Sequence, residues 1–259
     1  MGIPLRCLWS WFGTQMNEQN PVRTGVNRVM GVKEASRDTT VQTNLQNPRW
    51  DRQVTLKYVG ATLVQIAALT GLLWLMDGAF TRLSGLSLPQ GSSVAIASAF
   101  FAFVTLRSRL FSPLDNTRNS GRYTSIQRPG WAPPPLAFPI VWMSIAVLRV
   151  VSTYLVWSAV GETFLCLPLV LFVVHLSLGD TWNTIFTVEG RLGAAVPMVI
   201  IGPWLSVAAV TISYYQILPL AGWVIFPSWI WLTVATALCV SLWRLNGQEP
   251  LYPVVAAES

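Results

Sequence analysis

An all-α fold, in the form of a polytopic membrane helix bundle, is what this sequence predicts. Apolar residues make up 53% of the 259 residues and charged residues only 11%, whereas about 25% charged residues is usual in a soluble domain. The mean hydropathy is +0.49. Six apolar runs approach the length of about 20 residues that spans a bilayer. These observations indicate a chain that crosses a membrane several times.

Residues 1–55 form the first segment, which is polar and basic. It is rich in Asn, Thr, Arg and Val and has few acidic residues, as an organelle transit peptide would. Glu18, Glu34 and Asp38 argue against that interpretation, and a disordered tail is the alternative. Both interpretations stay open at this point.

The apolar runs follow in order. An extra helix over 56–76, with a linker up to residue 90, precedes a unit of five helices over 91–246, and residues 247–259 form a C-terminal tail. The five helices are expected at 91–107, 138–158, 163–186, 194–216 and 218–243. Prolines inside several of these runs are tolerated, because neighbouring helices can satisfy the carbonyl groups that a proline leaves without a donor.

The basic residues are distributed unevenly between the two ends of the predicted helices. With six spans, the N-terminal tail, the loops 108–137 and 187–193 and the C-terminus share one side, and they carry most of the Lys and Arg residues. The other side keeps only Arg82, and Arg149 lies inside a span. The positive-inside rule places the basic side in the cytoplasm, or in the stroma or matrix if the host is a plastid or mitochondrial membrane. The net charge of +6 therefore suits anionic lipid rather than nucleic acid.

The segment RPGWAPPPLAF, residues 128–138, places prolines and aromatic rings just before an apolar run. Proline restricts its own backbone and that of the preceding residue, so the segment is stiff before any ligand binds, and stiffness lowers the ordering cost of binding. Trp131 and Phe138 offer flat apolar surface, and Arg128 could pair with a carboxylate. A planar, amphipathic, acid-bearing molecule would suit such a site. The alternative is a proline-rich helix boundary with an interfacial tryptophan.

Three blocks of the sequence resemble the tryptophan-rich sensory protein family, also called the translocator protein or peripheral benzodiazepine receptor family. LGDTWNTIF (178–186) resembles its third helix, and FPSWIWLTVATALCVSLWRLN (226–246) resembles its last helix, including the final Asn246. YTSIQRPGWAPPPLAFPIVW resembles the first-loop pattern and agrees with it at Tyr123, Ser125, Pro129, Trp131, Pro133, Pro134, Phe138 and Trp142.

The chain also departs from the family pattern. Gly179 and Cys239 stand where the pattern has Asn, and Ser228 stands where it has Tyr. The extra helix and the N-terminal tail lie outside the five-helix pattern. The resemblance is therefore to a divergent member with an N-terminal extension.

The resemblance implies a five-helix bundle that binds a tetrapyrrole, such as a porphyrin or haem, between its helices and beneath a stiff first loop. For Trp142 and Trp231 it implies porphyrin contact and light-dependent porphyrin breakdown, and homodimers are common in the family. Helix packing is the alternative role for each tryptophan. The implied lining consists of Tyr123, Trp131, Pro133, Pro134, Phe138, Trp142, Trp182 and Trp231.

Three residues are candidate polar contacts: Arg128, His175 and Asp180. His175 is the only histidine, and no cluster of Cys or carboxylate residues accompanies it, so no metal site is predicted. It is either an axial haem ligand or a hydrogen-bonded residue between helices. Asp180 is an intramembrane carboxylate, which indicates either a proton or substrate contact or a structural pair within the bundle.

The favoured function is that of a membrane protein that binds a tetrapyrrole or another apolar planar ligand as a sensor, carrier or scavenger. The sequence holds no Ser/His/Asp or Cys/His arrangement, phosphate loop or paired carboxylates, so conventional hydrolase, kinase or dehydrogenase chemistry is not expected, and no cofactor is obligatory. Light-dependent porphyrin degradation is one alternative. The other is a structural role, in which the extra helix and the basic tail dock a larger membrane complex.

Overall fold

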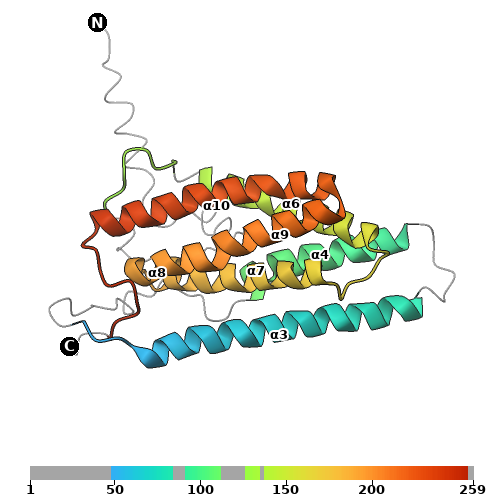
Figure 1. The fold of residues 1–259 in the computed structure, drawn as a ribbon, viewed down its shortest axis with the longest axis horizontal. Coiled ribbons are helices and arrows are strands. Elements are labelled where there is room, and N and C mark those ends of the chain that lie inside the picture. Colours follow the sequence, from blue (N-terminus) through green and yellow to red (C-terminus); the bar gives the residue numbers. More distant parts are fainter. Residues whose placement is uncertain (1–47, 84–90, 112–125, 135–136, 256–259) are drawn as a thin grey trace, which may run out of the picture.

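The computed structural model describes residues 48–83, 91–111, 126–134 and 137–255. They form long helices packed side by side in a bundle (Figure 1). Five helical stretches in these ranges are long and apolar enough to cross a membrane, and Ser92–Arg107 is a shorter apolar helix. The predicted multi-pass helix bundle is confirmed. The elements are α3 (Arg52–Leu83), α4 (Ser92–Phe111), α6 (Ala137–Ala159), α7 (Leu167–Asn183), η1 (Thr184–Val188), α8 (Leu192–Val199), η2 (Ile200–Trp204), α9 (Leu205–Ile217) and α10 (Pro219–Leu245).

The extra helix α3 begins four residues before the apolar run that predicts it, because a polar residue caps its start. Asp51 precedes the helix, and its side chain accepts a hydrogen bond from the Val54 backbone N–H at 2.9 Å. The helix therefore includes residues 52–55, which the sequence analysis assigned to the tail. The tail up to residue 47 and the predicted linker 84–90 lie outside the described residues.

Helix α7 begins at Leu167 rather than at residue 163, because Pro168 lies in its first turn, where a backbone N–H is not needed. The residues before it form a loop. In that loop the backbone N–H groups of Phe164 and Leu165 donate to the two oxygens of Asp77 at 2.5 and 2.9 Å. Asp77 belongs to α3, so these hydrogen bonds join the far half of α3 to the entrance of α7.

The span expected at 194–216 consists of three consecutive elements, because two prolines disturb its hydrogen bonding. Pro197 lies inside α8 and Pro203 lies inside η2, and neither has the N–H group that a helix residue donates. The chain widens into a π-turn at η2 and then continues as α9, without a break in the rod.

Polar side chains on one face of α3 join it to α7. Thr62 Oγ1 lies 2.5 Å from Thr181 Oγ1, and the Gln65 amide donates to Asp180 Oδ2 at 2.5 Å. Residues three apart share a helix face, so these contacts lie one above the other. The outer face of α3 carries exposed apolar side chains, such as Trp74 at 63% exposure. The extra helix is therefore a packed member of the bundle, and its outer face suits lipid.

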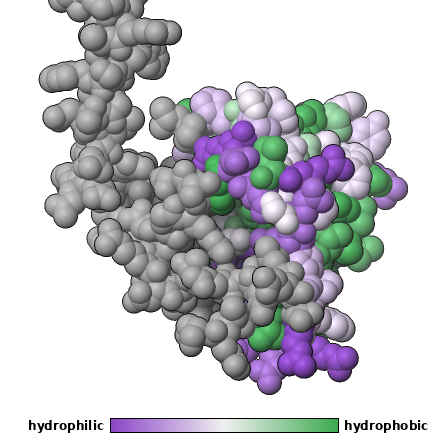
Figure 2. All heavy atoms as spheres, turned by 90° about the vertical axis from the view of Figure 1, so that its left-hand side faces the viewer, coloured by the Kyte–Doolittle hydropathy of each residue, from purple (hydrophilic) through white to green (hydrophobic). Residues whose placement is uncertain are grey.

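The start of α3 and the C-terminal tail meet at the same end of the bundle (Figure 1). Trp50 and Val254 form an isolated antiparallel β-bridge. Arg191, just before α8, donates to the Val254 carbonyl and to the Glu189 carboxylate at 2.9 and 2.8 Å, and Glu189 also accepts from the Tyr58 hydroxyl. The tail up to residue 255 is thus part of the folded structure. In the end-on view, hydrophilic side chains gather on this face beside hydrophobic ones (Figure 2).

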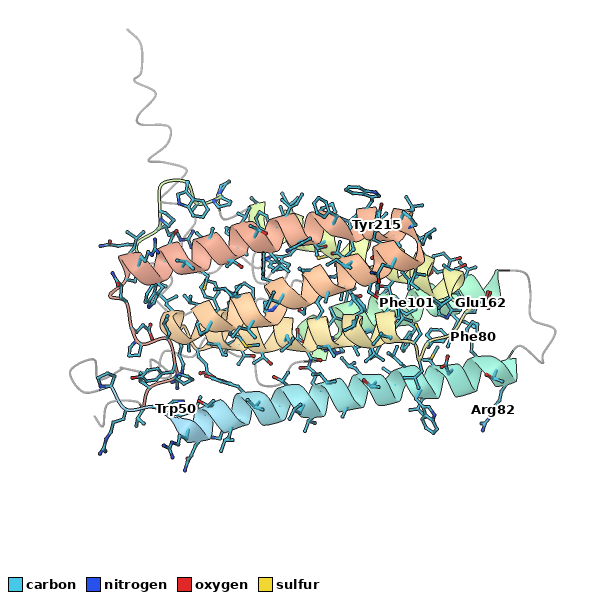
Figure 3. All side chains as sticks on the ribbon, in the orientation of Figure 1. Trp50, Phe80, Arg82, Phe101, Glu162 and Tyr215 are labelled. Atoms are coloured by element: carbon cyan, nitrogen blue, oxygen red, sulfur yellow. The ribbon has the colours of Figure 1, made fainter. Side chains whose placement is uncertain are left out.

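The opposite ends of α3 lie at opposite ends of the bundle, with Trp50 at one end and Arg82 at the other (Figure 3).

Buried apolar side chains form two clusters. The first lies toward the Arg82 end and contains packed aromatic rings, among them Phe101 and Trp157, each 1% exposed. The second lies toward the Trp50 end and contains Trp182, Ile185, Ala194, Ala195, Val196, Val199, Val207, Leu232, Ala235 and Cys239.

Candidate ligand site

The aromatic side chains at the start of α6 face the middle of α10. Phe138 and Trp231 pack edge to face, with their ring centroids 5.8 Å apart and an angle of 67° between the rings. Trp142 follows Phe138 by four residues and so lies on the same face of α6. Trp142 packs against the second buried cluster. The contact between α6 and α10 is thus built from large aromatic rings of both helices.

Trp182 belongs to the second cluster and is only 7% exposed. Its ring stacks on that of Phe186 in η1, with centroids 5.3 Å apart and an interplanar angle of 11°. Trp142, Leu232 and Cys239 pack in or against the same cluster. We call the contact of α6 with α10, together with the neighbouring second cluster, the aromatic site. It includes four of the predicted lining residues: Phe138, Trp142, Trp182 and Trp231.

The loop that precedes α6, described over residues 126–134, lies along the end of α10. Trp131 is 51% exposed, Pro133 is half-buried and Pro134 is exposed, so none of these predicted lining residues lies in the buried cluster. Arg128, a predicted polar contact, is also exposed. Tyr123 lies outside the described residues.

Asn246 holds this loop against α10. Its side-chain oxygen accepts the backbone N–H of Gln127 at 2.9 Å, and its amide nitrogen donates to the Gln127 carbonyl at 3.0 Å. The same nitrogen donates to the Leu242 carbonyl at 2.8 Å, one turn back in α10. Asn246 matches the family pattern, but it is not among the site residues predicted from the sequence. The signal that could have indicated its loop-holding role is a side-chain amide just past the end of a helix. Such an amide has both a donor group and an acceptor group.

His175 lies in α7 and is fully buried, with hydrogen-bond partners at both ring nitrogens. Its Nε2 lies 2.8 Å from Arg149 Nη2, and its Nδ1 lies 2.9 Å from Ser206 Oγ. A guanidinium group has only donors, so Nε2 accepts and the proton of the neutral ring resides on Nδ1. In this arrangement His175 connects α6, α7 and α9, and neither nitrogen is directed at the aromatic site.

Asp180 lies on the other side of α7 from Trp182, because two residues correspond to about 200° around a helix. Its Oδ2 lies 3.0 Å from Arg107 Nη2 in α4 and accepts from Gln65 in α3. Asp180 therefore joins α3, α4 and α7, and the structure does not bring it to the aromatic site. Within the described ranges there is no group of three or more His, Cys, Asp or Glu side chains that could hold a metal ion.

Comparisons with known proteins agree with this architecture. The sequence profile of the TspO/MBR family matches residues 92–244, from the first residue of α4 to the penultimate residue of α10. The chain is 34% identical over 131 residues to Protein CrtK of Rhodobacter capsulatus, which covers 50% of this chain and 81% of that protein. It is 32% identical over 127 residues to the human Translocator protein, covering 48% of this chain and 74% of that protein.

The Tryptophan-rich sensory protein of Cereibacter sphaeroides is 30% identical over 128 residues, which is 49% of this chain and 78% of that protein. Helix α3 precedes the part of the chain that matches the family profile. The five-helix unit, the tryptophan positions and these relatives all lead to one assignment. The chain is a multi-pass membrane protein that belongs to the TspO/MBR family.

Proposed function

We propose that this chain binds a tetrapyrrole, such as a porphyrin or haem, at the aromatic site and acts as a sensor, carrier or scavenger. The observation that carries the proposal is the edge-to-face contact of Phe138 with Trp231, with Trp142 one turn further along α6. Aromatic rings from α6 and α10 that lie at a similar level along the bundle offer both ring faces and ring edges to a planar ligand. Indole and phenyl rings bind such guests through stacking and apolar contact.

Family membership supports the same ligand class. The sequence resemblance implies tetrapyrrole binding for the family, and the aromatic site contains four of the residues to which it assigns contact. The relatives are named a tryptophan-rich sensory protein and a translocator protein, and a sensing or carrying role for this chain accords with both names.

The proposal includes an orientation. Exposed basic side chains at the Trp50 end include Arg49 and Arg52, which flank Trp50. The end of α10 lies at the same end of the bundle (Figure 1), with the exposed Arg244 in its last turn and the exposed Arg128 in the loop bound to Asn246. Arg82 lies at the other end (Figure 3). The positive-inside rule then directs the Trp50 end to the cytoplasm, or to the stroma or matrix of an organelle. A ligand would enter the aromatic site from that side, beside the loop that Asn246 holds.

A fluorescence titration tests the proposal. Protoporphyrin IX added to the full chain in detergent is expected to quench tryptophan emission with saturation. Trp142→Phe and Trp231→Phe each weaken the apparent affinity, because each removes the larger indole surface. Trp74→Phe is the control, since Trp74 lies 63% exposed on the outer face of α3. Quenching no greater than that of tryptophan in empty detergent micelles would overturn the proposal.

A further inference from the structure

Ser228 has a buried hydroxyl group whose hydrogen bonding differs from that of neighbouring polar residues in the same helix. Thr233 and Thr236 donate to the carbonyl groups four residues earlier, at 2.9 and 2.8 Å. Ser228 is 0% exposed, and its Oγ has no hydrogen-bond partner among the residues that the structure describes. A buried hydroxyl without a partner costs about 1–3 kcal/mol, so its presence in the core requires an explanation.

A second donor of the same kind lies next to it. The Nε1 of Trp231 is buried and also has no hydrogen-bond partner in the described part of the chain. Ser228 and Trp231 are three residues apart in α10, so their side chains are neighbours on the helix surface. An indole N–H can only donate, and a hydroxyl can donate. The pair therefore offers two adjacent donors, and an oxygen acceptor would satisfy both.

The donor pair lies at the depth of the aromatic rings. Helices α6 and α10 run in opposite directions, and the contact of Phe138 with Trp231 sets their relative position. Trp142 lies four residues beyond Phe138, about 6 Å further from the Trp50 end. Ser228 lies three residues before Trp231, about 4.5 Å in the same direction. Ser228 and Trp142 thus lie at similar depth on facing helices.

We infer that Ser228 and Trp231 recognise an oxygen acceptor, a carboxylate or carbonyl group at the edge of the planar ligand. This inference rests on the proposed function and narrows it to tetrapyrroles with oxygen-bearing side chains, as opposed to purely alkyl-substituted rings. The departure from the family pattern at this position makes Ser228 a specificity-determining residue of this chain.

Three related porphyrins test the inference: protoporphyrin IX, its dimethyl ester and etioporphyrin, which has no oxygen atoms. Ser228→Ala is expected to weaken protoporphyrin IX binding by about three- to tenfold, the usual effect of one hydrogen bond. It weakens the ester less, because an ester carbonyl is a weaker acceptor than a carboxylate. It leaves etioporphyrin affinity unchanged. Ser177→Ala is the matched control, because Ser177 is also fully buried but donates to the Val173 carbonyl at 2.9 Å.

The melting temperature of the ligand-free protein separates ligand recognition from packing. Ser228→Ala removes a hydroxyl that has no hydrogen-bond partner among the described residues, so the ligand-free melting temperature should not fall. Equal affinity of the unmodified protein and Ser228→Ala for protoporphyrin IX would overturn the inference, and so would an equal loss for all three porphyrins. If the unmodified protein binds none of the three, the proposed function itself fails. If it binds them but Ser228→Ala changes nothing, only the inference fails.

Discussion

Replacing Asp180 by Asn should destabilise the bundle by about 2–3 kcal/mol. Asp180 Oδ2 lies 3.0 Å from Arg107 Nη2, and the side chains of Asp180 and Arg107 are 27% and 12% exposed. Removing one partner of a fully buried ion pair costs about 3–5 kcal/mol, because the other charge is left without compensation. The partial exposure of Asp180 places the expected value at or below the lower end of that range. Asn has almost the same size and can still accept from Gln65, so the loss reports on charge.

The assay is unfolding of the full chain in mixed micelles, followed by tryptophan fluorescence as the fraction of denaturing detergent rises. Arg107→Met and the double variant with Asp180→Asn complete a double-mutant cycle, and the double variant should be more stable than the sum of the single effects predicts. Glu162→Gln is the control, since Glu162 is an exposed acid in the loop between α6 and α7. If Asp180→Asn changes the free energy of unfolding by less than about 0.5 kcal/mol, or if the two single effects simply add, the ion pair does not hold α4 against α7.

Three further predictions concern residues at or near the ends of helices. Asn246→Ala should abolish the hydrogen-exchange protection of the Gln127 amide, because that N–H donates to the Asn246 side chain; unchanged protection would show that another group holds the loop. Gly193→Ala should destabilise the protein by at least about 1 kcal/mol, because a Cβ at this position would lie 2.2 Å from a backbone carbonyl oxygen of the C-terminal tail. Gly60→Ala, which has open space around it, should be neutral or stabilising in the same unfolding assay. Burial raises the pKa of Cys166, so its alkylation rate should begin to rise at a higher pH in the folded protein than in the denatured one; coincident pH profiles would refute this.

The helices themselves were predictable because apolar composition is a local property. Each predicted span coincides with a helical stretch in the structure. The departures occur at helix ends, which single polar residues and prolines determine, and at the π-turn η2 inside the span 194–216. Asp51 starts α3 early, and Pro168 starts α7 late. Such caps act through individual hydrogen bonds, which an average over a window of residues does not detect.

The contacts of α3 were not predictable, because their partners lie far away in the sequence. Thr62 and Gln65 bond to residues 119 and 115 positions later. Within the apolar run they were only isolated polar residues. The structure shows that the inner face of α3 packs against its own bundle, so only its outer face is available to lipid or to another protein.

The candidate site was predictable in part. The pattern of aromatic residues predicts Phe138, Trp142, Trp182 and Trp231. In the structure Phe138 contacts Trp231, and Trp142 packs against the cluster that contains Trp182. The same pattern also included Trp131, which is half-exposed, because the loop follows the end of α10 to Asn246. The spacing of residues in the sequence predicts which side chains share a helix face. It does not predict the path that a proline-rich loop takes across another helix.

The absorption spectrum of the full chain after incubation with protoporphyrin IX and gel filtration tests the ligand site most directly. We predict a Soret band that co-elutes with the protein at a fixed stoichiometry and that is lost when Trp142 and Trp231 are both replaced by Phe, while the folded helix content is retained. A Soret band of equal intensity in the double variant would contradict the assignment of the aromatic site, and a spectrum without a Soret band in the unmodified protein would contradict tetrapyrrole binding.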